Sequence, residues 1–488
     1  ATGSYNTFVG TSAGEGGTTS APYSSGEYNT AVGYQALDAF TTGNSIVAIG
    51  SHAGGSITTA YSIVAVGASA AAGISTGYRN TVVGDGAGRT FNYNNNTIIG
   101  HGCGDRASGD YNVYIGGQAV GGTTATGAAN TVVGFQAMGI STGPQGAANT
   151  VAIGQQALLH TSSSNAVAVG YRAGYANQSA GNVFMGYQAG QYTTSGASNT
   201  FIGQQAGQGI TGARLSGASN TAVGYQAGFL LQGVALANTL IGRSAGDAIT
   251  TGGYNTAVGD NALGVTETGQ WNVAVGGASL GAVAGGFYNT AIGYLSGDTI
   301  TTGGRNVLVG MHAEASAADV DYEIVIGSGV DYSNAFAGGG TETVRIGRAS
   351  DYITCDFGEN ATWSHTSDKR IKKDIDDSDL GLSFINNLRP VTFKKKAPAE
   401  YPPEFKSYDA NQTERKNPNK IHYGFVAQEV KEAMDSVGHS EFPVWKENRD
   451  GMQELGETEL ITPLVKAVQE LTEMVKSQQK EIEELKKK

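Results

Sequence analysis

A glycine that recurs at nearly even spacing is the feature that most limits what this chain can fold into. The glycine ends a short motif such as "NTAVG", and most copies lie 16 to 18 residues apart. Val or Ile (once Met185) stands one position before it, and Thr, Val or Ile stands three positions before it. The twenty glycines are Gly10, Gly33, Gly50, Gly67, Gly84, Gly100, Gly116, Gly134, Gly154, Gly170, Gly186, Gly203, Gly224, Gly242, Gly259, Gly276, Gly293, Gly310, Gly327 and Gly347. This alternation of β-branched residues predicts a short strand that ends in a turn.

A unit this short cannot bury a core alone, whereas stacked copies can, because each pairs its backbone with the next. The repeats therefore predict a β-solenoid of about twenty short coils over residues 1–347. At roughly 4.8 Å per coil, the rod would be on the order of 95 Å long. Proline cannot donate to a ladder, and in this part it occurs only at Pro22 and Pro144, between the motifs.

Asparagine stands four residues before the glycine in fourteen of the twenty units, for example at Asn80, Asn199 and Asn255. In stacked coils these side chains form a column. The column is either a polar stripe that binds sugars or a hydrogen-bonded amide ladder. We favour the ladder, because asparagine tolerates turn geometry and bonds to nearby backbone.

A second column consists of aromatic residues directly after the glycine, with glutamine beside several of them. Its members are Tyr34, Phe135, Tyr171, Tyr187, Tyr225 and Tyr294. Aromatic faces flanked by amides suit glycans, yet stacking of the coils alone would also align the rings. Both interpretations stay open, and the five tyrosines are candidate glycan-binding residues.

Alanine three residues after the glycine in most units predicts a crowded interior. Cys103 occupies this position in "GHGCG", so we expect it to be a small buried residue rather than a nucleophile. With Cys355 as the only other cysteine, the chain has no disulfide framework.

Composition divides the chain near Ser364. Residues 1–363 hold 69 of the 74 glycines, 9 Lys and Arg and 19 Asp and Glu, whereas residues 364–488 hold 5 glycines, 21 Lys and Arg and 23 Asp and Glu. Residues 1–363 hold too few Lys and Arg residues for a basic surface patch, so we expect them to bind neither nucleic acid nor an anionic membrane. No run approaches the length of a membrane span, and the N-terminus lacks an initiator Met and a signal peptide, which suggests a fragment or a processed form.

The repeats resemble the β-roll heads of trimeric autotransporter adhesins and similar coils in phage tail fibres. The resemblance covers residues 1 to about 347, although those heads use a shorter unit. It implies a homotrimer with small residues toward the three-fold axis. Alanines two positions before the glycine are candidates for that face: Ala31, Ala48, Ala65, Ala222, Ala257 and Ala291.

After residue 371 the pattern is that of a small α+β domain. It predicts a helix over 380–388, a strand after Pro390, a long loop over 394–420, and a strand that passes into a helix over 422–434. Residues 459–488 form a heptad run with Ile461, Val468, Val475 and Ile482 at a, and Leu464, Leu471, Gln478 and Leu485 at d. This run predicts a coiled coil, whose β-branched a and Leu d residues lean toward a dimer.

Four segments, "SDKRIKKDI", "LRPVTF", "HYGFVAQEV" and "LVKAVQEL", closely resemble the intramolecular chaperone and auto-processing domain of phage endosialidases and tail fibres. The resemblance implies a domain that assembles three chains and then cuts itself off at Thr366–Ser367. It places the nucleophile at Ser367 and the base at Lys372. Asp368, Arg370 and His422 match the motif and are candidate orienting residues.

The proposed dyad has a clear chemical requirement. Serine needs a nearby base, and lysine accepts its proton only when burial or neighbouring positive charge lowers the lysine pKa. A spacing of five suits neither a helix nor a strand, so Ser367 and Lys372 need a turn or a neighbouring subunit to meet. His365 and His422 have no companion spacing for a metal site, and we expect neither metal nor cofactor.

The sequence thus predicts a mostly β fold: a trimeric β-solenoid shaft over 1–347, a neck over 348–366, and an α+β chaperone domain over 367–488 that ends in a coiled coil. The expected function is a phage tail fibre, found in the virion after assembly in the host cytoplasm. Its expected partners are a host-surface glycan or other receptor and further tail or baseplate proteins at the N-terminus. Self-cleavage is the only enzymatic activity favoured.

An alternative function is a depolymerase tailspike that cuts surface polysaccharide with the repeat region. Glycoside hydrolysis generally needs two carboxylates about 5–10 Å apart. The acids of the repeat region are scattered, and Asp319, Asp321 and Glu323 form the only close cluster in the sequence. We therefore favour binding over catalysis.

Overall fold

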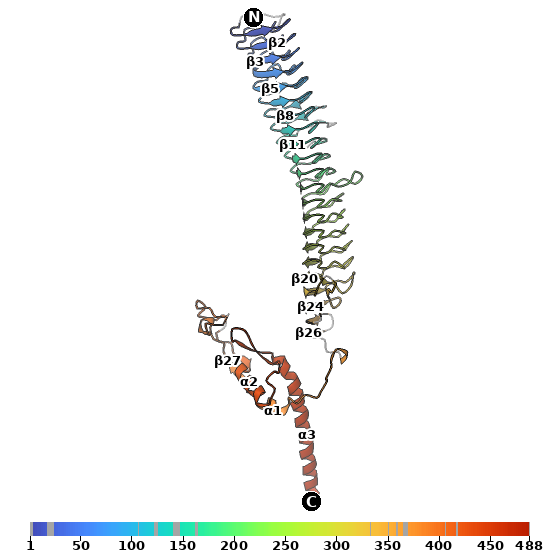
Figure 1. The fold of residues 1–488 in the computed structure, drawn as a ribbon, viewed down its shortest axis with the longest axis vertical. Coiled ribbons are helices and arrows are strands. Elements are labelled where there is room, and N and C mark those ends of the chain that lie inside the picture. Colours follow the sequence, from blue (N-terminus) through green and yellow to red (C-terminus); the bar gives the residue numbers. More distant parts are fainter. Residues whose placement is uncertain are drawn as a thin grey trace. The chain divides into compact units, whose positions relative to one another are not determined.

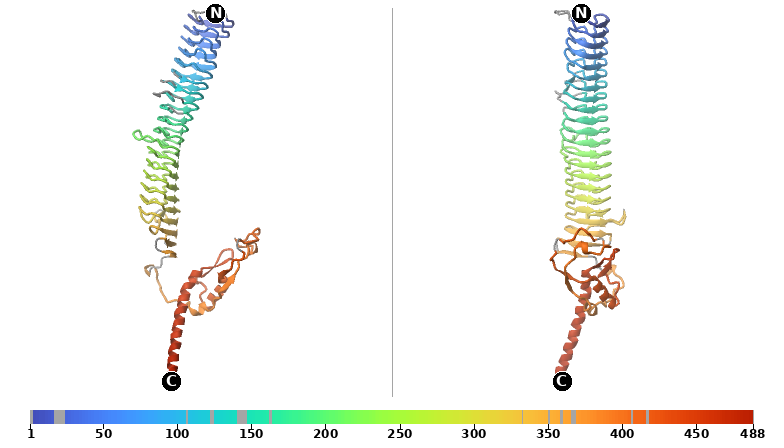
Figure 2. Two further views of the ribbon diagram at one scale, coloured as in Figure 1. Left: turned by 180° about the vertical axis from the view of Figure 1, so that it is seen from behind. Right: turned by 90° about the vertical axis from the view of Figure 1, so that its left-hand side faces the viewer.

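The computed structural model describes residues 3–487 except 17–23, 106, 122–124, 140–146, 162–163, 332, 350, 358–359, 365–368, 406 and 416–417. The chain divides into two compact units, residues 1–366 and residues 367–488. Figures 1 and 2 show that the first unit is a stack of coils and that the second is a small mixed unit with one long helix.

One 22-stranded sheet runs along the first unit, and all of its strands pair in parallel except β25 and β26 at its end. The parallel strands are β1 (Thr7–Val9), β2 (Thr30–Val32), β3 (Asn44–Ile49), β4 (Tyr61–Val66), β5 (Asn80–Val83), β6 (Thr97–Ile99), β8 (Val113–Ile115), β10 (Thr131–Val133), β11 (Val151–Ile153), β12 (Val167–Val169), β13 (Val183–Met185), β14 (Thr200–Ile202), β15 (Thr221–Val223), β16 (Thr239–Ile241), β17 (Thr256–Val258), β18 (Val273–Val275), β19 (Thr290–Ile292), β20 (Val307–Val309), β22 (Ile324–Ser328) and β24 (Thr343–Arg348). The solenoid is confirmed, with one strand for each of the twenty motifs.

The recurring glycine lets consecutive coils approach closely. Gly33 has φ +136°, and a Cβ added to it would lie 2.6 Å from the carbonyl oxygen of Gly50 in the next coil. A side chain there would meet both backbone strain and a steric clash, which explains why the position is glycine. Successive strands then pair in register, as Thr30, Ala31 and Val32 pair with Val47, Ala48 and Ile49.

The interior of the solenoid is narrow and is filled by small and apolar residues. The residue two before the glycine and the residue three after it point inward, as Ala48 and Ala53 do in one coil. Some coils carry larger side chains at the inward strand position, and Phe184 and Phe201 lie side by side in neighbouring coils. Cys103 occupies its alanine position inside this core, as predicted.

The predicted three-fold face is wrong at the level of residues. Ala31, Ala48, Ala65, Ala222, Ala257 and Ala291 are all fully buried inside their own coils. Because side chains alternate along a strand, a residue two before the glycine lies opposite to those one and three before it. The outer face therefore carries the β-branched residues at those two positions.

Short pairs and a terminal hairpin complete the first unit. The small parallel pairs are β7 (Ala107–Ser108) with β9 (Ala125–Thr126), and β21 (Ala313–Glu314) with β23 (Phe336–Ala337). The sheet then turns antiparallel through β25 (Asp351–Asp356) and β26 (Asn360–Ser364).

The second unit is a small α+β arrangement around its own core. Its elements are η1 (Lys369–Ile371), α1 (Leu382–Ile385), β27 (Val391–Phe393), η2 (Pro398–Glu400), β28 (His422–Gly424), α2 (Ala427–Ser436), β29 (Trp445–Glu447), β30 (Gln453–Leu455), η3 (Glu457–Leu460) and α3 (Ile461–Lys486). Phe384, Val430, Met434 and Val444 are buried together in the core. The predicted strand and strand-to-helix segment are confirmed, whereas the first helix is shorter than predicted.

Helix α3 exposes the predicted heptad positions. Its first turns are held by burial of Pro463 and Ala467 and by the Glu470 carboxylate, which accepts a hydrogen bond from the backbone N–H of Leu382. The a and d residues Ile461, Leu464, Val468, Leu471, Val475, Ile482 and Leu485 are all exposed. The helix is confirmed, and the coiled coil stays a prediction. No helix in the described part of the chain is long and apolar enough to cross a bilayer.

Candidate functional site

The predicted cleavage segment is only partly described. Thr366, Ser367 and Asp368 lie outside the described residues. Arg370 belongs to the single turn η1, and Lys372 follows it, with both side chains exposed. The backbone N–H of Lys372 donates to the carbonyl of Lys369, which closes this turn.

His422 lies on the β27–β28 hairpin, where its ring stacks on Phe393 with centroids 5.6 Å apart. Partial desolvation lowers the pKa of His422, and the positive charges of Lys395, Lys420 and Arg415 lower it further. The surroundings of His422 therefore favour the neutral form of its imidazole.

The asparagine column is a structural ladder, as favoured. The backbone N–H of Asn255 donates to Asn238 Oδ1 at 3.0 Å, and Asn255 Oδ1 accepts from the N–H of Asn272 at 3.0 Å. Its Nδ2 also donates to the carbonyl of Gly269 at 2.8 Å. Every asparagine of the column but Asn6 is buried, which excludes a sugar-binding stripe there.

The tyrosines after the glycine form an outward column. Tyr34, Tyr187, Tyr225 and Tyr294 are 45–52% exposed. Tyr171 is half-buried and stacks on Tyr187 with centroids 5.3 Å apart. The rings therefore lie along the surface rather than between the coils.

A pocket of about 490 Å³ is linked to the Tyr171–Tyr187 stack by Arg172, which lines the pocket and lies over the Tyr171 ring. Its wall includes His160, Arg172, Tyr175, Gln178, Gln191, Tyr192, Thr211 and Arg214. The Arg172 guanidinium lies 5.3 Å from the ring centre of Tyr171 and 5.2 Å from that of Tyr175. Aromatic, amide and guanidinium groups thus line one concave surface.

A further aromatic column was missed by the sequence analysis. It lies five residues before the glycine, where Tyr254 stacks on Trp271 and Trp271 on Tyr288, with centroids 5.6 and 5.0 Å apart. Arg305 continues the column beside Tyr288, and Tyr322 follows in the next coil. The signal was present in the sequence, because these residues are spaced by 17.

Two acids of the predicted cluster, Asp321 and Glu323, accept hydrogen bonds from the backbone, and Asp319 is exposed. Glu323 is buried, and its oxygens accept hydrogen bonds from the backbone N–H groups of Ser316 and Gly340. Asp321 likewise accepts from the N–H of Gly304. Both carboxylates thus hold turns in place.

The acids of a second cavity are also engaged. This cavity, of about 500 Å³, contains Asp85 and Asp105. Asp105 pairs with Arg89, and Asp85 lies 3.7 Å from His101. A glycosidase needs two carboxylates that face its substrate, whereas Asp105 faces the Arg89 guanidinium.

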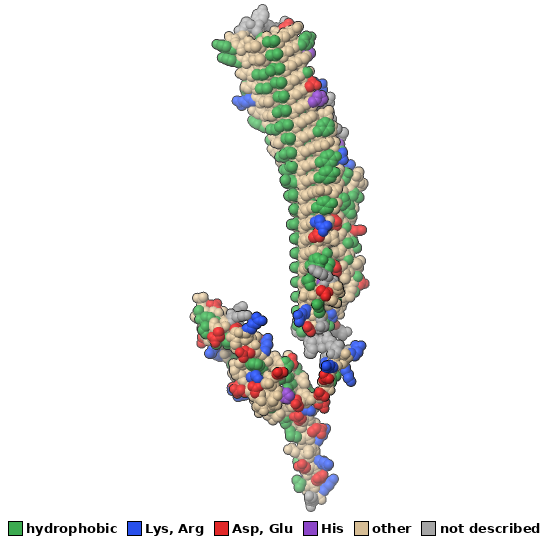
Figure 3. Space-filling model, viewed as in Figure 1, with side chains coloured by type: hydrophobic (Ala, Val, Ile, Leu, Met, Phe, Trp, Pro, Cys, Tyr) green, Lys and Arg blue, Asp and Glu red, His purple; other side chains and the backbone are tan. Residues whose placement is uncertain are grey.

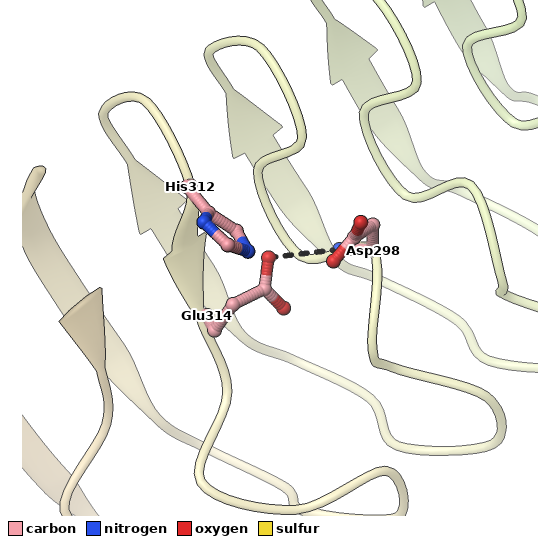
Figure 4. Close-up of side chains that lie close together, drawn as sticks. All are labelled: Asp298, His312 and Glu314. Carbon is pink, nitrogen blue, oxygen red and sulfur yellow. Dashed lines mark hydrogen bonds between the residues drawn. The ribbon is translucent and has the colours of Figure 1, made fainter. Parts of the chain in front are cut away.

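Three metal-ligating side chains meet near the end of the solenoid. Asp298, His312 and Glu314 each offer a ligand atom, and these atoms lie within 4.8 Å of one another. Figure 4 shows one ring nitrogen of His312 facing the Glu314 carboxylate, with Asp298 on the adjacent coil. Burial raises the pKa of Glu314 to about 8; the hydrogen bond from Thr299 lowers it, and nearby Asp298 raises it.

An unbroken apolar column marks the outer face of the sheet. It consists of the residue one before each glycine, so every coil contributes Val, Ile or Met. Members such as Ile49, Met185, Ile241 and Ile292 are about 40% exposed. Figure 3 shows a line of hydrophobic side chains along the repeat unit.

Comparison with protein-family models finds one match, to the chaperone of endosialidase, over residues 367–439. Residues 367–439 are thus similar to the chaperone of endosialidase. No curated protein and no solved structure matches the chain significantly. The chaperone family implies trimerisation and suggests a phage tail protein. A β-solenoid followed by a chaperone domain fits a tail fibre or tailspike.

Proposed function

We propose that the chain is a trimeric tail fibre of the virion that attaches to a host-surface glycan. The observation that carries this proposal is the joining of a twenty-coil solenoid to a chaperone domain. In this proposal the chaperone domain assembles three chains and then leaves by self-cleavage. The solenoid remains as the working part, held to other tail or baseplate proteins through its N-terminal end.

The apolar column supports trimer assembly along the shaft. An apolar column that continues over twenty coils is typical of an interface. Each Val or Ile left exposed to water would lose the free energy that its burial provides. Three copies that bring the columns together would cover it. Members such as Ile241 and Ile292 thus replace the alanines as the proposed inter-chain face.

Self-cleavage is proposed to occur at Thr366–Ser367, with Ser367 as nucleophile and Lys372 as base. The match to the chaperone family begins at Ser367, so the bond lies at the start of the domain. Lys372 is exposed directly after η1, and in this proposal a turn or a neighbouring chain completes the dyad.

A Ser367→Ala variant tests the dyad. We expect it to stay uncut yet folded, because a nucleophile is removed and no assembly surface is changed. Lys372→Ala should also stay uncut, whereas Lys369→Ala, the matched control in the same turn, should be cut. Mass spectrometry of the purified chains measures the outcome. Cleavage of Ser367→Ala at the same bond would refute the assignment.

Glycan binding is proposed at the pocket beside Tyr171 and Tyr187. One such site per chain binds weakly, and three chains together gain avidity. Tyr187→Gln and Arg172→Gln test it without disturbing the coil, since glutamine occupies the same positions in other coils, as Gln204 and Gln136. Phe135→Gln is the control, because it removes an equally exposed ring away from this pocket.

We expect the processed trimer to bind sugars on a glycan array, and the Tyr187 and Arg172 variants to lose that signal while the Phe135 variant keeps it. Equal binding by all folded variants would place the receptor site elsewhere. Release of reducing ends from host polysaccharide would instead favour the depolymerase alternative.

A further inference from the structure

Glu314 is a charged residue at a repeat position where the earlier coils carry small or apolar residues. It stands four residues after Gly310, where all seventeen preceding coils carry glycine, alanine, leucine, valine or methionine. The side chain is nevertheless inside, at 2% exposure. A carboxylate in a place built for small or apolar groups costs free energy unless a proton or a cation neutralises it.

The surroundings of Glu314 provide hydrogen bonds and, apart from the His312 ring, no basic side chain that pairs with it. Its oxygens accept from the backbone N–H groups of Asp298 and Thr299, at 3.2 and 3.1 Å, and from Thr299 Oγ1 at 2.6 Å. No lysine or arginine among the described residues forms an ion pair with Glu314 or Asp298. The second carboxylate, Asp298, adds negative charge at the same point.

His312 is oriented as a metal ligand usually is. Its Nδ1 lies 3.2 Å from the carbonyl oxygen of Asp331, and a carbonyl can only accept, so Nδ1 carries the hydrogen. In the neutral ring, Nε2 then presents its lone pair to the two carboxylates (Figure 4). A hydrogen bond from the second ring nitrogen to a backbone carbonyl is what fixes the tautomer of metal-bound histidines.

We propose that Asp298, His312 and Glu314 bind a divalent transition-metal ion that joins two neighbouring coils near the end of the solenoid. One imidazole and two carboxylates form a ligand set that suits Zn²⁺, with bonds of about 2.0–2.2 Å. The imidazole disfavours Ca²⁺ and Mg²⁺, which prefer oxygen ligands. Ligand atoms within 4.8 Å of one another close on such an ion through small side-chain movements.

The site ties separate parts of the stack together. Asp298 follows Gly293, whereas His312 and Glu314 follow Gly310 in the next coil. The His312 ring is in turn held by the carbonyl of Asp331, after Gly327. A bound ion would therefore cross-link the last coils, where the array has fewer neighbours to stabilise it.

The test uses the tag-free full chain, stripped with EDTA and titrated with Zn²⁺ by calorimetry. We expect one Zn²⁺ per chain and a higher melting temperature, which EDTA reverses. His312→Gln and Glu314→Leu install residues that other coils carry at these positions, Gln188 and Leu280, so the fold should persist. Each should weaken Zn²⁺ binding by at least about 100-fold, the upper range for loss of an outer-shell partner.

His52→Gln is the matched control, because His52 occupies the same repeat position as His312 without a buried acid beside it. It should bind Zn²⁺ like the wild type. Any of three results would overturn the proposal. The wild type could bind no Zn²⁺, folded His312→Gln could bind Zn²⁺ with unchanged affinity, or the His52→Gln control could lose as much Zn²⁺ affinity as His312→Gln. Ca²⁺ that binds as tightly as Zn²⁺ would overturn the choice of a transition metal.

Discussion

The glycine that ends each strand sets the closeness of the coils at the scale of a single residue. At Gly33 an added methyl group would strain a backbone of positive φ and clash with the Gly50 carbonyl at once. Gly212 offers a contrast, since nothing lies within 4 Å of its added Cβ and its φ is ordinary. The same amino acid is therefore obligatory at one site and replaceable at the other.

Gly33→Ala should lower the free energy of unfolding by roughly 2–5 kcal/mol, the sum of left-handed backbone strain and overpacking. Gly212→Ala should change it by less than about 0.5 kcal/mol, as other surface substitutions do. Urea unfolding of the processed shaft measures both. Equal stability of the two variants would mean that the close approach at Gly33 is not needed.

Cys103 shows how one residue takes its chemistry from its place in the repeat. Burial raises the pKa of its thiol to about 11, so the reactive thiolate is scarce at neutral pH. The structure therefore agrees with a packing role. The repeat position alone predicted this, because alanine occupies it in the neighbouring coils.

At the scale of elements, the asparagine ladder connects one coil to the next. Asn255→Ala removes the acceptor for the backbone N–H of Asn272, a residue that is buried away from solvent. We expect a loss of about 1–3 kcal/mol for that unsatisfied group. Thr302→Ala, on an exposed turn, is the control and should be nearly neutral. Chemical denaturation measures the free energy of unfolding of both variants. If Asn255→Ala leaves that free energy unchanged, the ladder aligns the coils without stabilising them.

The elements that could be predicted are those fixed by local pattern. The twenty strands follow from β-branched alternation before a glycine, and α3 follows from its heptads. It was harder to predict whether a side chain points into or out of the coil. Ala31 was assigned to the outer face, although the alternation of side chains along the strand turns it inward.

The candidate sites divide in the same way. The aromatic column at Tyr254, Trp271 and Tyr288 was visible as a spacing of 17 and was overlooked. The Asp298, His312 and Glu314 site could not be found by spacing. Asp298 and Glu314 are 16 residues apart and occupy different positions in their repeats. They meet because two successive coils stack, and the direction of each side chain around the coil is visible only in the structure.

At the scale of the whole molecule, assembly is the problem that the chaperone domain is proposed to solve. Apart from the terminal hairpin, the shaft is a parallel ladder whose strands pair at least one coil apart in sequence, and such non-local pairing is slow to form. While it forms, strand edges and the apolar column stay open to wrong partners, which promotes aggregation. A removable clamp that holds three chains together shortens this exposed phase.

A gene that ends at Thr366 should therefore yield aggregated shaft, whereas shaft released by self-cleavage after folding should be soluble and heat-resistant. The two products have the same sequence, so any difference between them is kinetic in origin. Size-exclusion chromatography and thermal melting of both preparations measure it. Adding the chaperone domain as a separate chain is a useful control, since covalent linkage raises its effective concentration and the separate chain should rescue little. Soluble, heat-resistant trimer from the truncated gene would show that the shaft finds its register unaided.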